Sequence, residues 1–186
     1  MIDGHAAVDL SAYAVDHHLL HTALAGAGKL ERYELYVSEP SATSGDARRS
    51  ALAVARLGPQ ACGHPQVVHG GAIAALLDDV FGCAFFASSM GQGFTANLTV
   101  DYRKPLRPGR TVHVRAAVER VEPSSSGRAK KVFLVGRITD AEDGTVITDA
   151  RALFIVKVQP ATPWGTLLAW LGFAPPLEVL PMGVKS

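Results

Sequence analysis

The length, composition and charge of the chain exclude several classes of protein. Its 186 residues are 48% hydrophobic and 19% charged, as in a globular domain with a sizeable core rather than a disordered or fibrous chain. A net charge of +1 gives no general attraction to nucleic acid or membranes. Two cysteines cannot build a disulfide framework, and the first residues lack the basic flank and apolar core of a signal peptide. We therefore expect a soluble protein of the cytoplasm, or of an organelle matrix if a leader has been removed, with no nucleic-acid partner.

The first third of the chain predicts a helical segment followed by two strands. Residues 9–28 are typical of a short helix that is ended by glycines, and we assign residues 1–29 to an N-terminal helical segment. Residues 30–37 alternate between apolar and polar side chains, as in a half-buried strand. Residues 50–57 favour a second strand, which a Gly-Pro pair ends.

Residues 70–90, GGAIAALLDDVFGCAFFASSM, predict one long apolar helix. The segment is about as long as a membrane span, but the two adjacent aspartates at its middle would be expensive in lipid. A helix that is apolar nearly all round is instead expected inside a soluble domain.

Four alternating segments follow the helix, at residues 94–103, 111–121, 131–139 and 146–158. The last two are expected to form a hairpin about the turn at residues 142–144. Six strands and a single buried helix predict an α+β fold, in which an antiparallel β-sheet wraps around one long central helix. We assign residues 30–158 to this domain.

Residues 159–186 form a proline-rich tail with an apolar middle, TPWGTLLAWLGF. This stretch is too short to span a bilayer. We expect the tail to pack on the protein's own surface or on that of a partner. The alternative is interfacial contact with a membrane, for which Trp164 and Trp170 are the supporting side chains.

The turn His69-Gly70-Gly71 precedes the long helix and has the features of a ligand site. The glycines allow the backbone to approach a ligand closely, and the helix start directs unpaired N–H groups and a partial positive charge at the same place. Such a corner can hold the oxygen of a polarised carbonyl, as an oxyanion hole does. The alternative is a tight turn that merely begins a buried helix.

Asp78 and Asp79 lie at the middle of the helix, on different helix faces. Residues three, four and seven apart share a helix face, so Asp78 lies with small residues: Gly71, Ala74, Ala75 and Gly82. Asp79 lies with a bulkier set: Ala72, Leu76, Cys83 and Phe86. The available space favours Asp78 as a buried general base or nucleophile. A hydrogen bond within the helix packing is the alternative for Asp78 and the favoured role for Asp79.

The run HGGAIAALLDD from His69, followed by TANLTVDYRKP from Thr95, resembles the PaaI-type hotdog thioesterases. It is especially similar to the mitochondrial-type members, which carry HGGAIA…D and TANL. The resemblance covers residues 67–157 and implies a hotdog fold that hydrolyses an acyl-CoA to the free acid and CoA without a cofactor. It also implies a homodimer or a dimer of dimers, with sites shared between subunits.

The resemblance implies roles for the residues of both motifs. The family's carboxylate lies nine residues after the histidine of HGG, which is Asp78, and the amide that polarises the carbonyl carries over to Gly70. Gly71 is then a second donor or a packing position. Thr95 matches a Ser or Thr that positions the attacking water, and His69 stabilises the turn.

This sequence departs from the family at one position, because some members carry an Asn six residues before the HGG histidine. Here that position is Gly63, which leaves the neighbouring His64 as a candidate substitute. Basic side chains at strand ends suit the phosphates of CoA, and the RAKK run matches a basic pair of similar enzymes. Solvated surface charge is the alternative for each. The substrate-binding candidates are His64, Asn97, Arg103, Lys104, Arg128, Lys130 and Lys131.

Other functions remain as alternatives. A non-catalytic acyl-CoA-binding or regulatory hotdog protein is the main one, although a mere binder gains nothing from a buried acid. His17 and His21 have the spacing of metal ligands on a helix, but no carboxylate or third histidine completes a set, and we expect no metal site. Cys83 is expected to be a small core residue.

Overall fold

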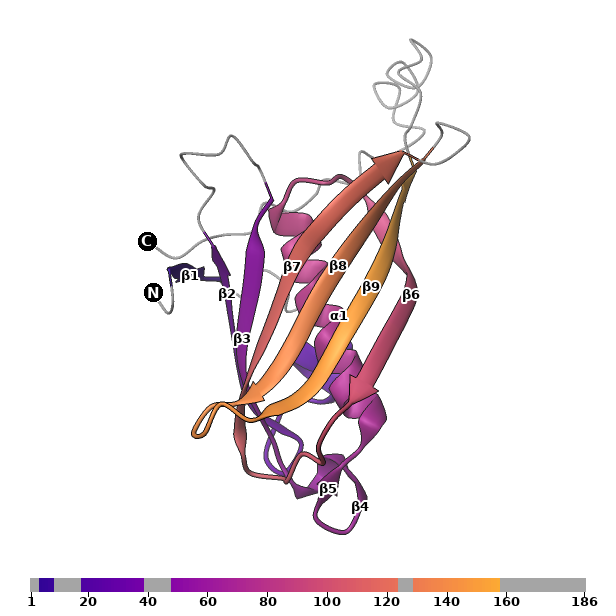
Figure 1. The fold of residues 1–186 in the computed structure, drawn as a ribbon. Helices are drawn as coiled ribbons and strands as arrows, with labels where there is room; N and C mark the ends of the chain where they lie inside the picture. The colour runs from indigo at the N-terminus through magenta and orange to yellow at the C-terminus, as the bar shows by residue number, and fades with distance from the viewer. Residues whose placement is uncertain (1–3, 9–17, 39–47, 124–128, 158–186) are drawn as a thin grey trace.

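The structure is a computed structural model that describes residues 4–8, 18–38, 48–123 and 129–157 (Figure 1). The tail at residues 159–186 and Arg128 lie outside the described residues. In chain order the elements are β1 (His5–Ala7), η2 (Leu19–Ala23), β2 (Leu30–Ser38), β3 (Ser50–Leu57), η3 (Pro59–Ala61), β4 (Cys62–His64), β5 (Val67–Val68), α1 (Gly70–Ala87), β6 (Gly93–Tyr102), β7 (Thr111–Pro123), β8 (Ala129–Asp140) and β9 (Val146–Lys157).

One antiparallel sheet of seven strands, in the order β1-β2-β3-β7-β8-β9-β6, curves around α1 (Figure 1). The predicted α+β architecture is therefore confirmed. The strands before and after the helix meet at the centre of the sheet, where β3 pairs with β7. As a result β6, the strand that directly follows the helix, lies at one edge.

Helix α1 packs its apolar side against the concave face of the sheet. Its fully buried residues include Leu76, Leu77, Val80 and Phe81. The packing is close at Gly136 of β8, where an added Cβ would lie 2.7 Å from Cζ of Phe81. The helix is long and apolar enough to cross a membrane by composition alone, and here it packs inside the sheet. It ends at Ala87 rather than at residue 90, since Ser88 caps it and Ser89 has a positive φ of 51°.

The N-terminal region differs from the prediction of a helical segment over residues 1–29. The described part begins with β1, which pairs with β2, and its helical structure is a single π-helical turn, η2. A strand of three residues is too short to show an alternating pattern, which is why the sequence did not predict it. The predicted helical residues 9–17 lie outside the described residues.

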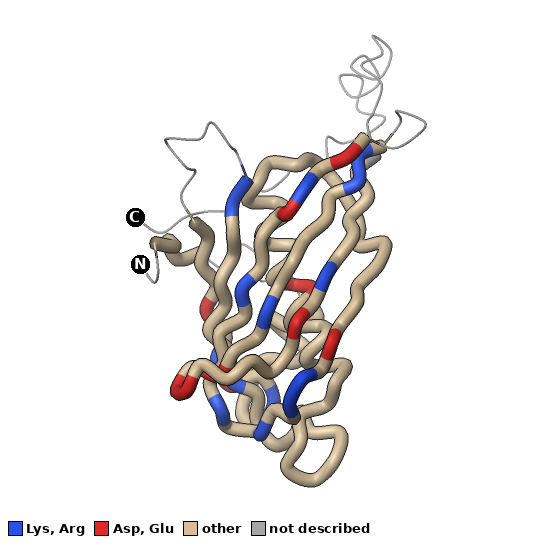
Figure 2. Tube along the Cα trace, viewed as in Figure 1, with Lys and Arg blue, Asp and Glu red and all other residues tan. Residues whose placement is uncertain are grey.

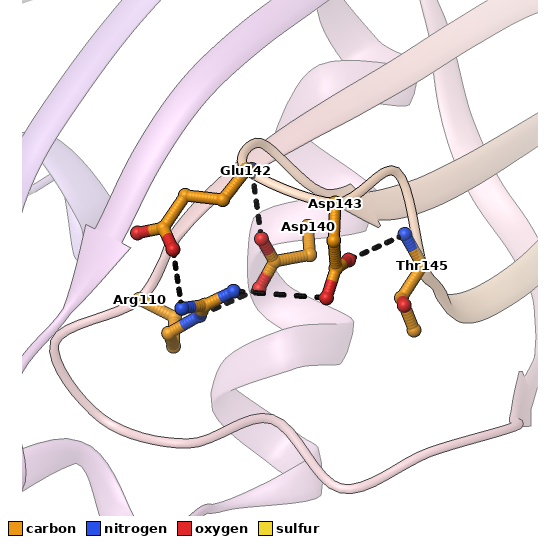
Figure 3. Close-up of polar contacts among 5 residues, drawn as sticks. All are labelled: Arg110, Asp140, Glu142, Asp143 and Thr145. Carbon is orange, nitrogen blue, oxygen red and sulfur yellow. Dashed lines mark hydrogen bonds and ion pairs between the residues drawn. The ribbon is translucent and has the colours of Figure 1, made fainter.

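The predicted hairpin of β8 and β9 is confirmed, and a charged cluster fixes its turn (Figure 3). Arg110, just before β7, donates from Nε to Asp140 Oδ2 at 2.8 Å and from Nη1 to Glu142 Oε2 at 2.6 Å. Asp143 accepts from the amide of Thr145. The hydrogen bond from the guanidinium holds the pKa of the buried Asp140 carboxyl below its usual value.

Candidate active site

Asp78 of α1 and Thr95 of β6 lie together on the side of the helix that the sheet leaves open. Thr95 Oγ1 donates to Asp78 Oδ1 at 2.9 Å. Among the described residues Thr95 is the one hydrogen-bond donor to Asp78. The structure thus unites two residues that the sequence assigned to one site, although 17 positions separate them.

A β-bulge in β6 makes this contact compatible with the core. Thr95 pairs with Phe154 and Asn97 with Leu153, so Ala96 is the extra residue. In a regular strand positions 95 and 98 would face opposite sides, but the bulge directs both Thr95 and Leu98 toward the helix. Asn97 consequently faces away from α1, where its Oδ1 accepts from Thr99 at 3.1 Å. Within this chain the structure therefore does not bring Asn97 to Asp78.

A cavity of about 330 Å³ opens beside Asp78 and Thr95 and is mostly apolar. We call it the Asp78 cavity. Its apolar lining comes from Leu35, Gly82, Cys83, Phe86, Gly93, Phe94 and Phe154, and its remaining wall from His18, His21 and Asp79. Phe94 is 76% exposed and Phe86 39%, so large apolar side chains stand at its rim without cover from the described residues.

Asp79 has a different environment from Asp78. The buried hydroxyl of Tyr33 donates to Asp79 Oδ2, and His21 Nε2 lies 3.4 Å from the same oxygen. Burial, together with the Asp79 charge, raises the pKa of Tyr33 well above its usual value and also raises the pKa of the Cys83 thiol. Tyr33 and Cys83 therefore stay protonated, and Cys83 is a core residue. The Asp79 carboxylate is tied to β2, which supports the choice of Asp78 as the reactive acid.

In the glycine turn at the start of α1, the backbone N–H groups of Gly70 and Gly71 have different roles. The ring of His69 caps the helix, because its Nδ1 accepts from the Gly71 N–H at 2.8 Å. Gly71 therefore has no free N–H for an oxyanion, and it is a packing position: an added Cβ would lie 2.9 Å from His69 Nδ1. The Gly70 N–H has no hydrogen-bond partner among the described residues. The hydroxyl of Tyr102 donates to the Gly70 carbonyl at 2.8 Å, a contact between residues 32 positions apart that no local pattern predicts.

A second cavity, of about 450 Å³, opens at this turn. It is lined by residues that include His64, His69, Gly70, Tyr102, Arg103 and Lys104. The departure at Gly63 has a steric reason, since a Cβ there would lie 2.7 Å from Cδ2 of the His69 ring. A side chain at position 63 would displace the ring that caps α1, and the exposed His64 is the polar group next to it.

The two halves of the candidate site are far apart within one chain. Asp78 follows Gly70 by eight residues on a straight helix, which corresponds to roughly 12 Å along its axis. A single thioester group is too small to contact both. One chain therefore presents an acid with an apolar cavity at the middle of α1, and a free amide with a second cavity of mixed lining at its start.

The basic candidates are also divided between the two ends of the sheet. Arg103 lies near the helix start and is held by Asp149, with 3.2 Å between Nε and Oδ2, while Lys104 is exposed beside it. Lys130 and Lys131 lie at the opposite end, across β9 from the first residues of β6. Figure 2 shows Lys and Arg interspersed with Asp and Glu over the outer face of the sheet, so that face carries no single sign of charge.

A curved antiparallel sheet around one central helix, with a carboxylate on the helix and a glycine turn at its start, defines a hotdog-fold domain. Residues 65–126 match the family model of the thioesterase superfamily. Among curated proteins it is similar to acyl-coenzyme A thioesterase THEM4 of Xenopus laevis, with 37% identity over 109 residues, 59% of this chain and 46% of that protein. The rat protein of the same name is 39% identical over 102 residues, 54% of this chain and 40% of the relative. The chain thus spans less than half the length of these relatives.

Solved structures show the same architecture. A thioesterase superfamily protein known from its crystal structure is 29% identical and covers 66% of this chain and 53% of its own, with a TM-score of 0.53. A thioesterase protein from Streptococcus pneumoniae, solved with coenzyme A, is 15% identical and covers 69% of this chain and 88% of its own, with a TM-score of 0.55. At that identity the second likeness shows the fold alone.

Proposed function

We propose that the protein is an acyl-CoA thioesterase, which hydrolyses an acyl-CoA to the free acid and CoA. The observation that carries the proposal is the Asp78–Thr95 pair at an apolar cavity large enough for an acyl group. The names of the curated relatives support the substrate class. No resident metal or cofactor is needed for this reaction, since water, a base and an oxyanion donor suffice.

The site residues suit hydrolysis in two steps. Thr95 holds one oxygen of Asp78, and the carboxylate accepts a proton from water as the water oxygen attacks the thioester carbon. The Gly70 N–H donates to the carbonyl oxygen, which becomes negative as the tetrahedral intermediate forms. Collapse breaks the C–S bond, and the departing thiolate takes the proton from Asp78. Direct attack by Asp78, through an anhydride that water then hydrolyses, uses the same groups.

The working site is proposed to form between two copies of the chain. Asp78 and Gly70 lie roughly 12 Å apart along one helix, so a second copy must supply one of them. Two features favour such an assembly. On its outer side the edge strand β6 pairs with no other strand of the described residues, and the open face of α1 is lined with glycine and alanine. A homodimer with two shared sites, or a dimer of such dimers, satisfies both.

Mixing two inactive variants tests the shared site. Asp78→Asn lacks the acid, and Gly70→Pro lacks the amide donor. After the variants are unfolded and refolded together, half of the dimers are mixed and each mixed dimer has one intact site, so activity should return to about a quarter of the wild-type value. Refolding each variant alone is the control. A mixture as inactive as its components, with mixed dimers shown by mass spectrometry, would contradict sites shared in this way.

The basic side chains are proposed to bind the nucleotide end of CoA. Lys130 and Lys131 are exposed and form no ion pair among the described residues, and Arg128 precedes them in the sequence. Replacing the three by glutamine should raise KM for acyl-CoA more than it lowers kcat, and should affect an acyl-pantetheine little. Equal losses for both substrates would show that these residues are surface charge.

We propose a cytoplasmic or organelle-matrix location.

The activity itself is tested by incubating the protein with a panel of acyl-CoAs and a reagent for free thiols. Release of CoA thiol that requires Asp78 is the expected result. Binding of acyl-CoA without thiol release would instead favour the non-catalytic binding protein.

A further inference from the structure

Two histidines of the N-terminal segment meet one aspartate of α1 at the wall of the Asp78 cavity. His18 Nε2 lies 3.6 Å from Asp79 Oδ1, and His21 Nε2 lies 3.4 Å from Asp79 Oδ2. One ligand atom from each of the three residues lies within 4.8 Å of the other two. No local spacing in the sequence links this carboxylate to the histidines, because 58 positions separate His21 from Asp79.

We propose that His18, His21 and Asp79 bind one divalent transition-metal ion of the zinc class. Two imidazoles and a carboxylate are ligands that Zn²⁺ and its first-row neighbours prefer. Neighbouring donor atoms around a tetrahedral zinc ion lie roughly 3.3 Å apart, given metal–ligand bonds of about 2.0–2.1 Å. The two observed separations end on different oxygens of Asp79. Each is close to this value, and both are long for direct hydrogen bonds, which are commonly about 2.9–3.0 Å.

The surroundings hold these groups in place. The side chain of His21 is 8% exposed and that of Asp79 16%, so neither is a free surface group. The hydroxyl of Tyr33 donates to Asp79 Oδ2, the kind of hydrogen bond that orients a metal ligand. The rings of His18 and His21 lie edge to face with centroids 4.0 Å apart.

Binding would change one contact and leave one coordination position open. In the structure His18 Nδ1 accepts from the His21 amide at 3.3 Å. A metal on Nε2 places the proton on Nδ1, so this long hydrogen bond would be given up. Three protein ligands leave a fourth position of a tetrahedral ion for water or another small ligand. That position would lie at the cavity that Asp78 and Thr95 also line.

Metal titration of the untagged full-length chain, freed of metal by a chelator, tests the proposal. We expect one equivalent of Co²⁺ to bind with the visible absorption of a four-coordinate ion, to be displaced by Zn²⁺, and not to be displaced by Mg²⁺. His21→Gln and Asp79→Asn should each weaken binding at least about tenfold, and Tyr33→Phe by about 10- to 100-fold. His113→Gln, which removes a half-buried imidazole from β7 outside the cluster, is the matched control and should bind as the wild type.

Melting curves of every variant, recorded without metal, separate lost ligands from lost folding. If His21→Gln does not fold, His18→Gln replaces it, because the His18 side chain is 30% exposed. Absence of stoichiometric binding by the wild type would overturn the proposal. So would folded His18, His21 or Asp79 variants that bind as tightly as the wild type, which would indicate other histidines as the ligands. The titration contains no thioester, so its failure would leave the proposed thioesterase activity standing, and the converse also holds.

Discussion

Replacing Gly70 with proline removes a single N–H group from the candidate site and leaves the helix intact. Gly70 is the first residue of α1, where the N–H has no partner within the helix and proline is well tolerated. The preceding residue, His69, already has the extended backbone that a following proline demands, with φ −62° and ψ 132°. The cap from the Gly71 amide to the His69 ring involves neither the nitrogen nor the side chain of position 70.

The expected loss follows from the role of one donor to an oxyanion. Removing such a donor typically lowers kcat by about 10²–10³-fold, or about 2.7–4 kcal/mol of transition-state stabilisation. KM should change little, because the bond to the carbonyl oxygen strengthens only as negative charge develops. Turnover is measured as release of CoA thiol from the best acyl-CoA of the panel, alongside the melting temperature.

Gly70→Ala is the matched control, since it adds a Cβ and keeps the N–H. That Cβ would lie 3.2 Å from the hydroxyl of Tyr102, the far end of a side chain that is 52% exposed and can move. We therefore expect the alanine variant to keep most of its activity. Equal kcat values for the proline and alanine variants, both folded, would refute the assignment of the Gly70 amide as the donor.

Three further predictions concern the acid, the core and the hairpin turn. Asp78→Asn should lower kcat by about 10²–10⁴-fold at nearly constant KM, whereas Asp79→Asn should lose less turnover and more thermal stability; the reverse order would show that the helix faces are misassigned. Gly136→Ala should lower the free energy of unfolding by about 1–3 kcal/mol in urea titrations, because the added Cβ would overlap the buried ring of Phe81 in α1. An unchanged urea midpoint would contradict this packing. Arg110→Met should lower the melting temperature at neutral pH. The folded pKa of Asp140 lies below its usual 3.8, so the stability it contributes is present above pH 3.8 and is lost as the pH falls through the folded pKa. The difference in melting temperature between the wild type and Arg110→Met should therefore shrink below about pH 3.8. A difference in melting temperature that stays constant from pH 7 to pH 3 would argue against this ion pair.

The sequence predicted those features that depend on local periodicity. The apolar run with two aspartates at its centre predicted a buried helix, and the three-, four- and seven-residue spacing separated the face of Asp78 from that of Asp79. Both predictions concern neighbours on one element. The long strands β7, β8 and β9 were predicted for the same reason, since their alternation extends over enough residues to be recognised.

The features that escaped prediction depend on distant partners. The bulge at Ala96 becomes visible only when β6 is aligned against β9, and it decides that Thr95 faces the helix while Asn97 does not. The histidines beside Asp79 come from a turn that no pattern in the sequence links to α1. The task of Gly71 was left open by the sequence, and the ring nitrogen of His69 resolved it by accepting the Gly71 amide.

The position of β3 next to β7 has a consequence for how the chain folds. The strands β7, β8 and β9 pair with their neighbours in sequence, so this meander can form from contacts that close short loops. Pairing of β3 with β7 instead encloses everything from Leu57 to Arg110, including the whole of α1 and β6. Closing so long a loop costs more chain entropy, and folds rich in such contacts fold slowly. Because α1 precedes β7 and β8 in the chain, the apolar helix is synthesised before the strands that cover it. Until β7 and β8 pair, the nascent chain exposes the hydrophobic surface of this helix, the kind of surface that chaperones bind.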